Sequence, residues 1–287
     1  MTGTHGIRRR PEDMNEMLSP DGAPERPLLG EAPKGSYRAR DGNGVEIDTH
    51  EAVFPILRMD SSQHLHLVGT AFFIADNGIF ATAKHVVTSV FDPDGVPLDP
   101  LIVLQFAPGG TVYQRAVHRV THHRVSDVAV GVLWPVHHKT TGKTLPNKLF
   151  KLVSTPPPIG ASVATYAHPK TRIVHGTPQE VHVESSFFVG TLVESFPEGR
   201  DHTMLPGPCF QTSMVIHGGA SGGPVVGPDG RAFGINSTGF EDDFVSFVSP
   251  ISEILDLAIP GIVLPGESHA RDVTVRELSD RKLVVLG

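Results

Sequence analysis

The sequence predicts an all-β protein built from two successive units of short strands. The chain has 287 residues, of which 30 are Gly and 25 are Pro, and only 19% are charged. So many turn formers with so few charged residues argue against coiled coils and long-helix bundles. Hydrophobic residues make up 39% of the chain, enough to bury a sizeable core, and they occur in short runs separated by turn residues.

Composition also excludes several classes of function. The formal net charge of −7 gives no electrostatic basis for binding nucleic acid. No apolar stretch approaches the ~18 residues that a membrane span needs, so we expect no membrane association. A single cysteine, Cys209, excludes an intrachain disulfide, and no apolar run follows the charged residues 1–10 as it would in a signal peptide. These features together predict a cytoplasmic protein.

Residues 1–50 differ from the rest of the chain in composition and in hydropathy pattern. They are rich in Pro and Gly, carry charges of both signs and show almost no apolar periodicity. Such a segment cannot offset the entropy of its own ordering, so we expect a flexible N-terminal extension. Two interpretations stay open: a solvated extension, or an arm that binds a regulatory partner.

The first strand-rich unit is expected at about residues 51–136. Asp76-Asn77-Gly78 predicts a tight hairpin turn between two of its strands. The expected strands are 52–57, 65–74, 79–82, 101–106, 112–120 and 128–133.

A Pro-containing linker is expected over 137–158, followed by a second unit at about 159–250. Its expected strands are 161–166, 181–183, 187–192, 224–226, 232–237 and 244–248. A short helix is expected over 251–258, where apolar residues recur on one face, and 259–287 is expected to be a C-terminal tail.

Three local patterns could carry chemistry. His85 ends a strand, Asp127 directly precedes another, and Ser221 lies in a run of small residues over 218–224. A serine hydroxyl becomes a nucleophile when a general base lies within hydrogen-bond reach and a third group orients that base. A Gly-rich turn lets backbone N–H groups approach the developing oxyanion. Each pattern alone is weak, because such a serine is more often part of a simple turn, but the order and spacing of the three strengthen the inference.

On these residues the chain resembles the chymotrypsin-like (trypsin-fold) serine peptidases, especially disulfide-free bacterial kinds such as glutamyl endopeptidases and HtrA-type proteases. The resemblance covers about residues 51–258. It rests on 69–74, the His85 segment, 127–130, 219–224 and 234–237. It implies two six-stranded antiparallel β-barrels with a short C-terminal helix, a protein or peptide substrate, and no cofactor.

The resemblance implies a role for each residue of the site. Ser221 is expected to be the nucleophile, His85 the general base and then acid, and Asp127 the group that orients His85. The backbone N–H groups of Gly219 and Ser221 are expected to form the oxyanion hole. Ser237 occupies the position of a residue that hydrogen-bonds the triad Asp.

Substrate contacts are expected from two segments, with Val215 and Ile216 on one side and Ser237, Thr238 and Gly239 on the other. Residues 237–239 would pair with the substrate backbone as an edge strand. No acid occurs in 213–216, so a Lys or Arg at P1 is disfavoured.

Two departures from relatives in the family bear on activation and specificity. Asn236 replaces the His of glutamyl endopeptidases, which leaves a small or medium apolar P1 as the expectation. Ala220 replaces the Asp that pairs with a new N-terminus in zymogens, so we expect activity without N-terminal cleavage.

Three other interpretations of these residues differ in what the sequence offers them. The pattern around Ser221 also satisfies the nucleophile elbow of α/β-hydrolases, but that elbow must run directly into a helix, and 224–230 indicate a strand and a turn. A catalytically silent module that binds peptides in the same cleft is the alternative function. The 16 histidines show no zinc-ligand spacing, so no metal site is expected.

Overall fold

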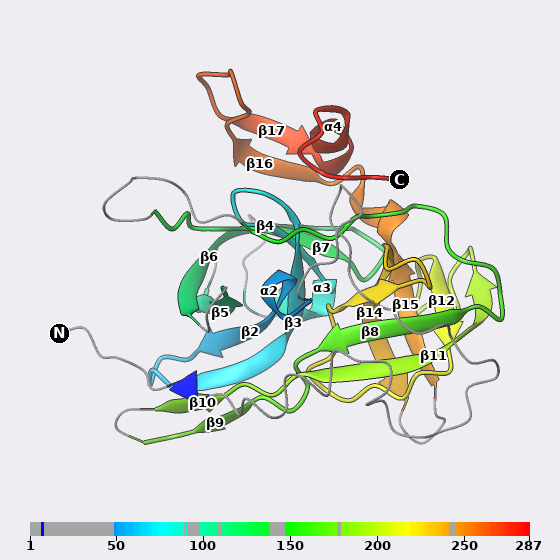
Figure 1. The fold of residues 1–287 in the computed structure, drawn as a ribbon, viewed down its shortest axis with the longest axis horizontal. Coiled ribbons are helices and arrows are strands. Elements are labelled where there is room, and N and C mark those ends of the chain that lie inside the picture. The colour runs from blue at the N-terminus through cyan, green and yellow to red at the C-terminus, as the bar shows by residue number, and fades with distance from the viewer. Residues whose placement is uncertain are drawn as a thin grey trace.

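The computed structural model describes residues 7–8, 49–88, 90, 98–107, 111–137, 147–176, 179–240 and 245–287. Two closed six-stranded β-barrels, antiparallel throughout, form its main body (Figure 1), which confirms the predicted fold class. Most of the predicted N-terminal extension and residues 138–146 of the predicted linker lie outside the described residues. Within the described residues, no helix is long and apolar enough to cross a membrane.

The first barrel has the strand order β2-β3-β4-β7-β6-β5. Its strands are β2 (Val53–Met59), β3 (Leu65–Ala75), β4 (Ile79–Thr82), β5 (Leu101–Phe106), β6 (Val112–His122) and β7 (Ala129–Leu133). All six predicted strands are therefore present. The predicted hairpin turn is also formed: Asn77 and Gly78 have φ of 64° and 80°, as a type I′ turn requires.

The second barrel has the order β11-β12-β15-β14-β13-β8. Its strands are β8 (Ser162–Ala167), β11 (Ser186–Phe196), β12 (Cys209–Thr212), β13 (Pro224–Val226), β14 (Ala232–Phe240) and β15 (Val245–Pro250). β12 was not predicted, because it is a four-residue run that directly follows Pro206-Gly207-Pro208. The predicted strand 181–183 was assigned to the barrel wrongly. It forms β10 (Glu180–His182), which pairs with β9 (Arg172–Val174) outside the barrel, and β10 also pairs with β1 (Ile7–Arg8).

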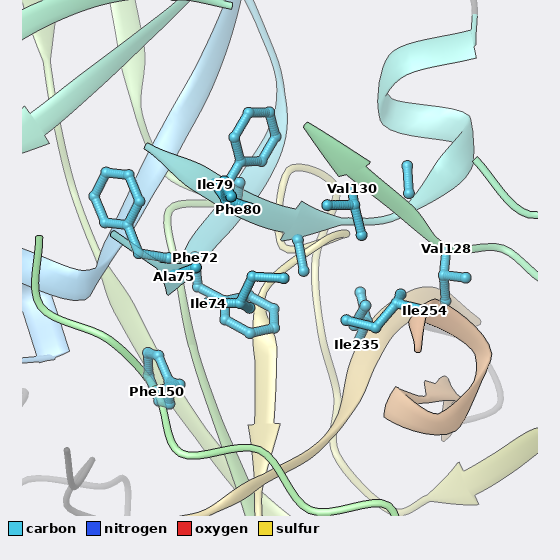
Figure 2. Close-up of a cluster of buried hydrophobic side chains, with 14 of the residues drawn as sticks. Phe72, Ile74, Ala75, Ile79, Phe80, Val128, Val130, Phe150, Ile235 and Ile254 are labelled. Atoms are coloured by element: carbon cyan, nitrogen blue, oxygen red, sulfur yellow. The ribbon is translucent and has the colours of Figure 1, made fainter. Parts of the chain in front are cut away.

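One apolar cluster joins the two barrels. Phe72, Phe80 and Val130 of the first barrel belong to the same buried cluster as Ile235 of β14 and Ile254 (Figure 2). Burying each such side chain contributes about 1.5–3 kcal/mol. This shared core holds the facing ends of the barrels, where the site lies, in one arrangement.

The segment after the second barrel is more ordered than predicted. The expected helix 251–258 is a short 3-10 helix, η3 (Ile251–Ile254), because Ala258 already begins strand β16. β16 (Ala258–Ile262) pairs with β17 (Arg271–Thr274), and α4 (Val275–Asp280) follows. The predicted tail is therefore a folded C-terminal unit, which lies over the first barrel in Figure 1. Apolar residues of this unit, including Ile259, Leu264, Val273 and Leu278, belong to the shared core cluster.

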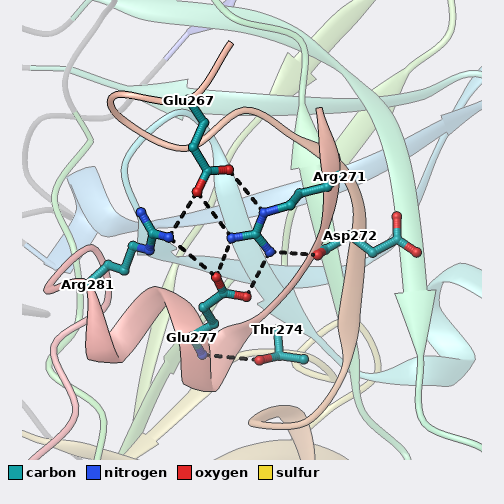
Figure 3. A network of polar contacts seen from close by, with 6 residues as sticks. All are labelled: Glu267, Arg271, Asp272, Thr274, Glu277 and Arg281. Atoms are coloured by element: carbon teal, nitrogen blue, oxygen red, sulfur yellow. Dashed lines mark hydrogen bonds and ion pairs between the residues drawn. The ribbon is translucent and has the colours of Figure 1, made fainter. Parts of the chain in front are cut away.

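A network of charged side chains links the parts of the C-terminal unit (Figure 3). Arg271 pairs with Glu267 at 3.0 Å and with Glu277, and Arg281 pairs with Glu267 at 2.9 Å. The Thr274 side chain caps α4 by accepting from the Glu277 N–H at 3.1 Å. Since the charged groups are exposed, the apolar contacts dominate the stability of the unit.

Candidate active site

Three pieces of chain meet where the barrels face each other. His85 lies in α3 (Lys84–Thr88), directly after β4, and Asp127 lies directly before Val128 and β7. Because β4 pairs with β7 with Thr82 opposite Ala129, both residues reach the same end of the first barrel. Ser221 lies in the turn before β13 of the second barrel. The predicted triad residues therefore come from both barrels, as expected.

His85 and Asp127 form a closely coupled pair. His85 Nδ1 lies 2.8 Å from Asp127 Oδ2, and the His85 backbone N–H donates to Oδ1 at 2.9 Å. An ionised carboxylate only accepts hydrogen bonds, so when His85 is neutral its proton is on Nδ1 and Nε2 keeps a free lone pair. The His85 side chain is 51% exposed and that of Asp127 18%, so the base is accessible while the acid is shielded.

Asp127 is held from several sides. The Ser237 hydroxyl donates to Oδ2, as the resemblance implied for this position. The neighbouring Ser126 donates its hydroxyl to Glu253 of η3 at 2.5 Å, which fixes the turn that presents Asp127. Burial raises the pKa of Asp127, but the hydrogen bonds and charge of His85 and the hydrogen bond of Ser237 outweigh burial and lower that pKa overall.

Ser221 has a different partner from the one the triad would give it. Its Oγ donates to the carbonyl oxygen of Ser237 at 2.9 Å. Within the described part of the chain, no hydrogen bond joins Ser221 Oγ to His85. The carbonyl of Ser237 is available because β14 shifts register against β15 between Asn236 and Thr238. The hydroxyl of Ser221 is therefore hydrogen-bonded to the backbone of β14 and not to His85.

The two N–H groups expected to form the oxyanion hole can be checked against the hydrogen bonds of the serine turn. The Gly219 carbonyl accepts from the Thr70 hydroxyl at 2.8 Å, and the Ser221 carbonyl accepts from the Thr70 N–H at 2.9 Å. The Ala220 N–H donates to His217 at 3.1 Å, and the Gly222 N–H donates to Asn236 at 2.8 Å. Among the described residues, the N–H groups of Gly219 and Ser221 have no acceptor. Since backbone donors are normally paired, these two are available to an incoming oxygen.

Two glycines of the turn are dictated by geometry. Gly219 has a φ of 91° and Gly222 a φ of 89°, a region that residues with a Cβ rarely adopt. A Cβ on Gly222 would lie 2.1 Å from the Thr70 carbonyl oxygen. The Gly-rich sequence around Ser221 therefore lets the second barrel approach the first.

The predicted substrate-contact segments lie against each other. Ile216 is almost fully buried, and its Cγ1 lies 2.9 Å from where a Cβ on Gly239 would stand. Met214, which directly precedes Val215 in the chain, is fully buried. These contacts hold residues 214–216 against Gly239 of β14.

Sequence reasoning assigned no role to Thr70, although it lies in one of the motifs that carried the resemblance. Its contacts to the serine turn span a large separation in the sequence, and no local pattern signals them. Among the residues with described positions, no group of three or more His, Cys, Asp or Glu is arranged to hold a metal ion.

Comparison with known proteins shows the family to which this chain belongs. The sequence pattern of the trypsin-like peptidase domain matches residues 69–235, which include His85, Asp127 and Ser221. The chain belongs to the trypsin-like peptidase domain family. This membership confirms the resemblance seen in the sequence and identifies the protein as a trypsin-like peptidase.

Solved structures agree with this peptidase in fold. Deg5 matches with a TM-score of 0.55 at 20% identity, covering 77% of this chain and 92% of that chain. The active form of the Rv3671c protease from M. tuberculosis matches with a TM-score of 0.50 at 18% identity, covering 72% of this chain and 78% of that chain. A search of curated protein sequences found no significant match.

Proposed function

We propose that this peptidase is a serine endopeptidase that uses His85, Asp127 and Ser221 as its catalytic triad. The observation that carries the proposal is the pair of N–H groups on Gly219 and Ser221 that have no acceptor among the described residues. They lie in the same turn as a serine hydroxyl that is bonded to Ser237, the residue that also bonds Asp127 of the His–Asp pair. Unpaired donors at this place are what a developing oxyanion needs.

The proposed chemistry proceeds through an acyl-enzyme. Ser221 Oγ rotates from the Ser237 carbonyl to His85 Nε2, gives up its proton and attacks the scissile carbonyl carbon. The N–H groups of Gly219 and Ser221 stabilise the resulting oxyanion, and His85 returns the proton to the leaving amine. Water then attacks the ester with His85 again acting as base, and Asp127 stabilises the imidazolium in both steps.

The substrate in this proposal is an extended peptide. Its backbone would pair with residues 237–239, where the Ser237 carbonyl lies outside the β14–β15 pairing. Ile216 packs against Gly239, which limits the space between the two substrate-contact segments. Residues 213–216 contain no acid. Both features support a small or medium apolar P1 residue. Profiling of cleavage sites in a denatured proteome tests this preference directly.

A silent peptide-binding module is the second candidate. The observation that favours it is the hydrogen bond from Ser221 to Ser237 in place of one to His85. Against it, the base, the orienting acid and both oxyanion donors are present.

A fluorophosphonate probe separates the two candidates, because it forms a bond only with an activated serine. We expect rapid labelling of the full chain and none of Ser221→Ala. Wild-type protein that is folded but unlabelled would favour the binding module.

A further inference from the structure

We propose that Thr70 is a positioning residue that sets the oxyanion hole from the opposite barrel. Thr70 lies in β3 of the first barrel and is fully buried, whereas the serine turn belongs to the second barrel. The inference rests on the proposed function, because it concerns how the two N–H donors of that function are aimed.

Every polar group of Thr70 is engaged. Its N–H donates to the Ser221 carbonyl at 2.9 Å, and its hydroxyl donates to the Gly219 carbonyl at 2.8 Å. Its own carbonyl accepts from the Thr82 hydroxyl at 2.7 Å. The hydroxyl oxygen accepts from the His168 N–H at 3.1 Å, so the hydroxyl proton is directed to Gly219.

These bonds hold two peptide planes of the serine turn. In the peptide plane between residues 219 and 220, the Gly219 carbonyl accepts from the Thr70 hydroxyl, and the Ala220 N–H donates to the His217 carbonyl. The plane 221–222 is held in the same way by Thr70 and by the Asn236 carbonyl. The Ser221 N–H belongs to the plane between them and cannot turn away without breaking one of these bonds. The Gly219 N–H adjoins the first held plane.

The Ala220 carbonyl, in the plane that carries the Ser221 N–H, also accepts from the Gly223 N–H at 3.1 Å and from Asn236 Nδ2 at 3.4 Å, so Thr70 acts together with these bonds. At Gly219, the groups nearest the turn exert no such directional restraint. A Cβ on Gly219 would lie 2.9 Å from Leu67 Cδ2 and 3.1 Å from Pro169 Cα, so the turn is tightly enclosed by groups that exert no directional force there. The hydroxyl of Thr70 therefore orients the Gly219 carbonyl, which the shape of the side chain alone would not do. Valine at this position would keep the shape and leave the Gly219 carbonyl without its donor.

The test measures how fast Ser221 reacts with a fluorophosphonate, in full-length protein at a range of probe concentrations. In this reaction a bond from Ser221 Oγ to phosphorus forms, the bond from phosphorus to fluorine breaks, and the proton passes to His85. The phosphoryl oxygen takes the place of the oxyanion. The variants are Thr70→Val, Thr70→Ser and, as a matched control, Thr212→Val. Thr212 is an equally buried threonine that bonds to Ser246 in the second barrel.

We expect Thr70→Val to lower the maximal inactivation rate about 10- to 100-fold, less than loss of an oxyanion donor itself. The probe concentration at half-maximal rate should stay within about twofold, because the donors act only as charge develops. Thr70→Ser should restore most of the rate, and Thr212→Val should match wild type. If Thr70→Val does not fold, Thr70→Ala takes its place.

Two outcomes are distinguishable failures. A folded Thr70→Val variant that reacts at the wild-type rate, or a Thr70→Ser variant that is as slow as Thr70→Val, overturns the positioning role alone. Wild-type protein that does not react overturns the proposed function, and the role of Thr70 with it.

Discussion

The carbonyl oxygen of Ser237 accepts the hydroxyl proton of Ser221 at 2.9 Å. The same Ser237 donates its own hydroxyl to Asp127, so one residue of β14 contacts both the nucleophile and the orienting acid of the proposed triad. A substrate that pairs with β14 through its P1 N–H would compete for this carbonyl. Binding of the correct peptide would then release Ser221 toward His85.

The first prediction concerns this competition. An ester of an N-acetylated amino acid should be hydrolysed faster than the same ester methylated on its P1 nitrogen, because only the first can donate to Ser237. We expect kcat/KM to fall about tenfold or more on methylation, the equivalent of one lost hydrogen bond. Equal values for the two esters, measured by release of p-nitrophenol, would show that Ser221 leaves Ser237 without help from the substrate.

The second prediction concerns Asp127 in catalysis. Asp127→Asn should lower kcat about 10⁴-fold, because an amide can hold His85 in the wrong tautomer. The measurement is ester hydrolysis at pH 8 with matched protein concentrations. Ser126→Ala is a useful companion, since it loosens the turn but keeps the carboxylate, and a much smaller effect is expected there.

The pKa of Asp127 also makes a prediction about stability. Its pKa is lowered in the folded state, so its ionisation stabilises the protein above the unfolded pKa of about 3.9. That contribution is lost as pH falls through the folded pKa. The Tm difference between wild type and Asp127→Asn should shrink as pH falls below 4. A difference that instead grows toward low pH would mean that the pKa is raised.

The fourth prediction concerns the close approach of the barrels at Gly222. Gly222→Ala should abolish fluorophosphonate labelling, because the new methyl group would meet the Thr70 carbonyl and the Thr82 hydroxyl, at 2.1 and 2.2 Å. The φ of 89° adds backbone strain. Gly218→Ala is the matched control, since a Cβ there has no neighbour within 4 Å. Labelling of Gly222→Ala at the wild-type rate would contradict the described turn.

Much of this arrangement could be predicted from the sequence, for reasons that particular residues make clear. Strand 79–82 and the turn at Asn77 follow from local alternation and turn chemistry. The places of His85, Asp127 and Ser221 followed from motifs whose order matches the family. The hydrogen bonds of Thr70 to the serine turn could not be predicted in this way, because they join residues about 150 positions apart. The carbonyls that accept them are backbone groups with no side-chain signature.

The C-terminal unit shows the same limit at the level of the fold. The runs at 258–262 and 271–274 are short and contain Pro260, Gly261 and charged residues, so local propensity favours a tail. Tertiary burial overrides that propensity: Ile259 and Val273 are at most 1% exposed where the unit meets the first barrel.

The last prediction tests what holds this unit in place. Leu278→Ala, at a side chain 1% exposed in α4, should lower the free energy of unfolding by about 2–5 kcal/mol, because it leaves a cavity in the shared core. Arg271→Ala removes the centre of the exposed ion network and should have a smaller effect that vanishes as salt is raised. Urea unfolding at low and high salt measures both. If Arg271→Ala proved the more damaging variant at every salt concentration, the charged network rather than apolar burial would hold the unit on the first barrel.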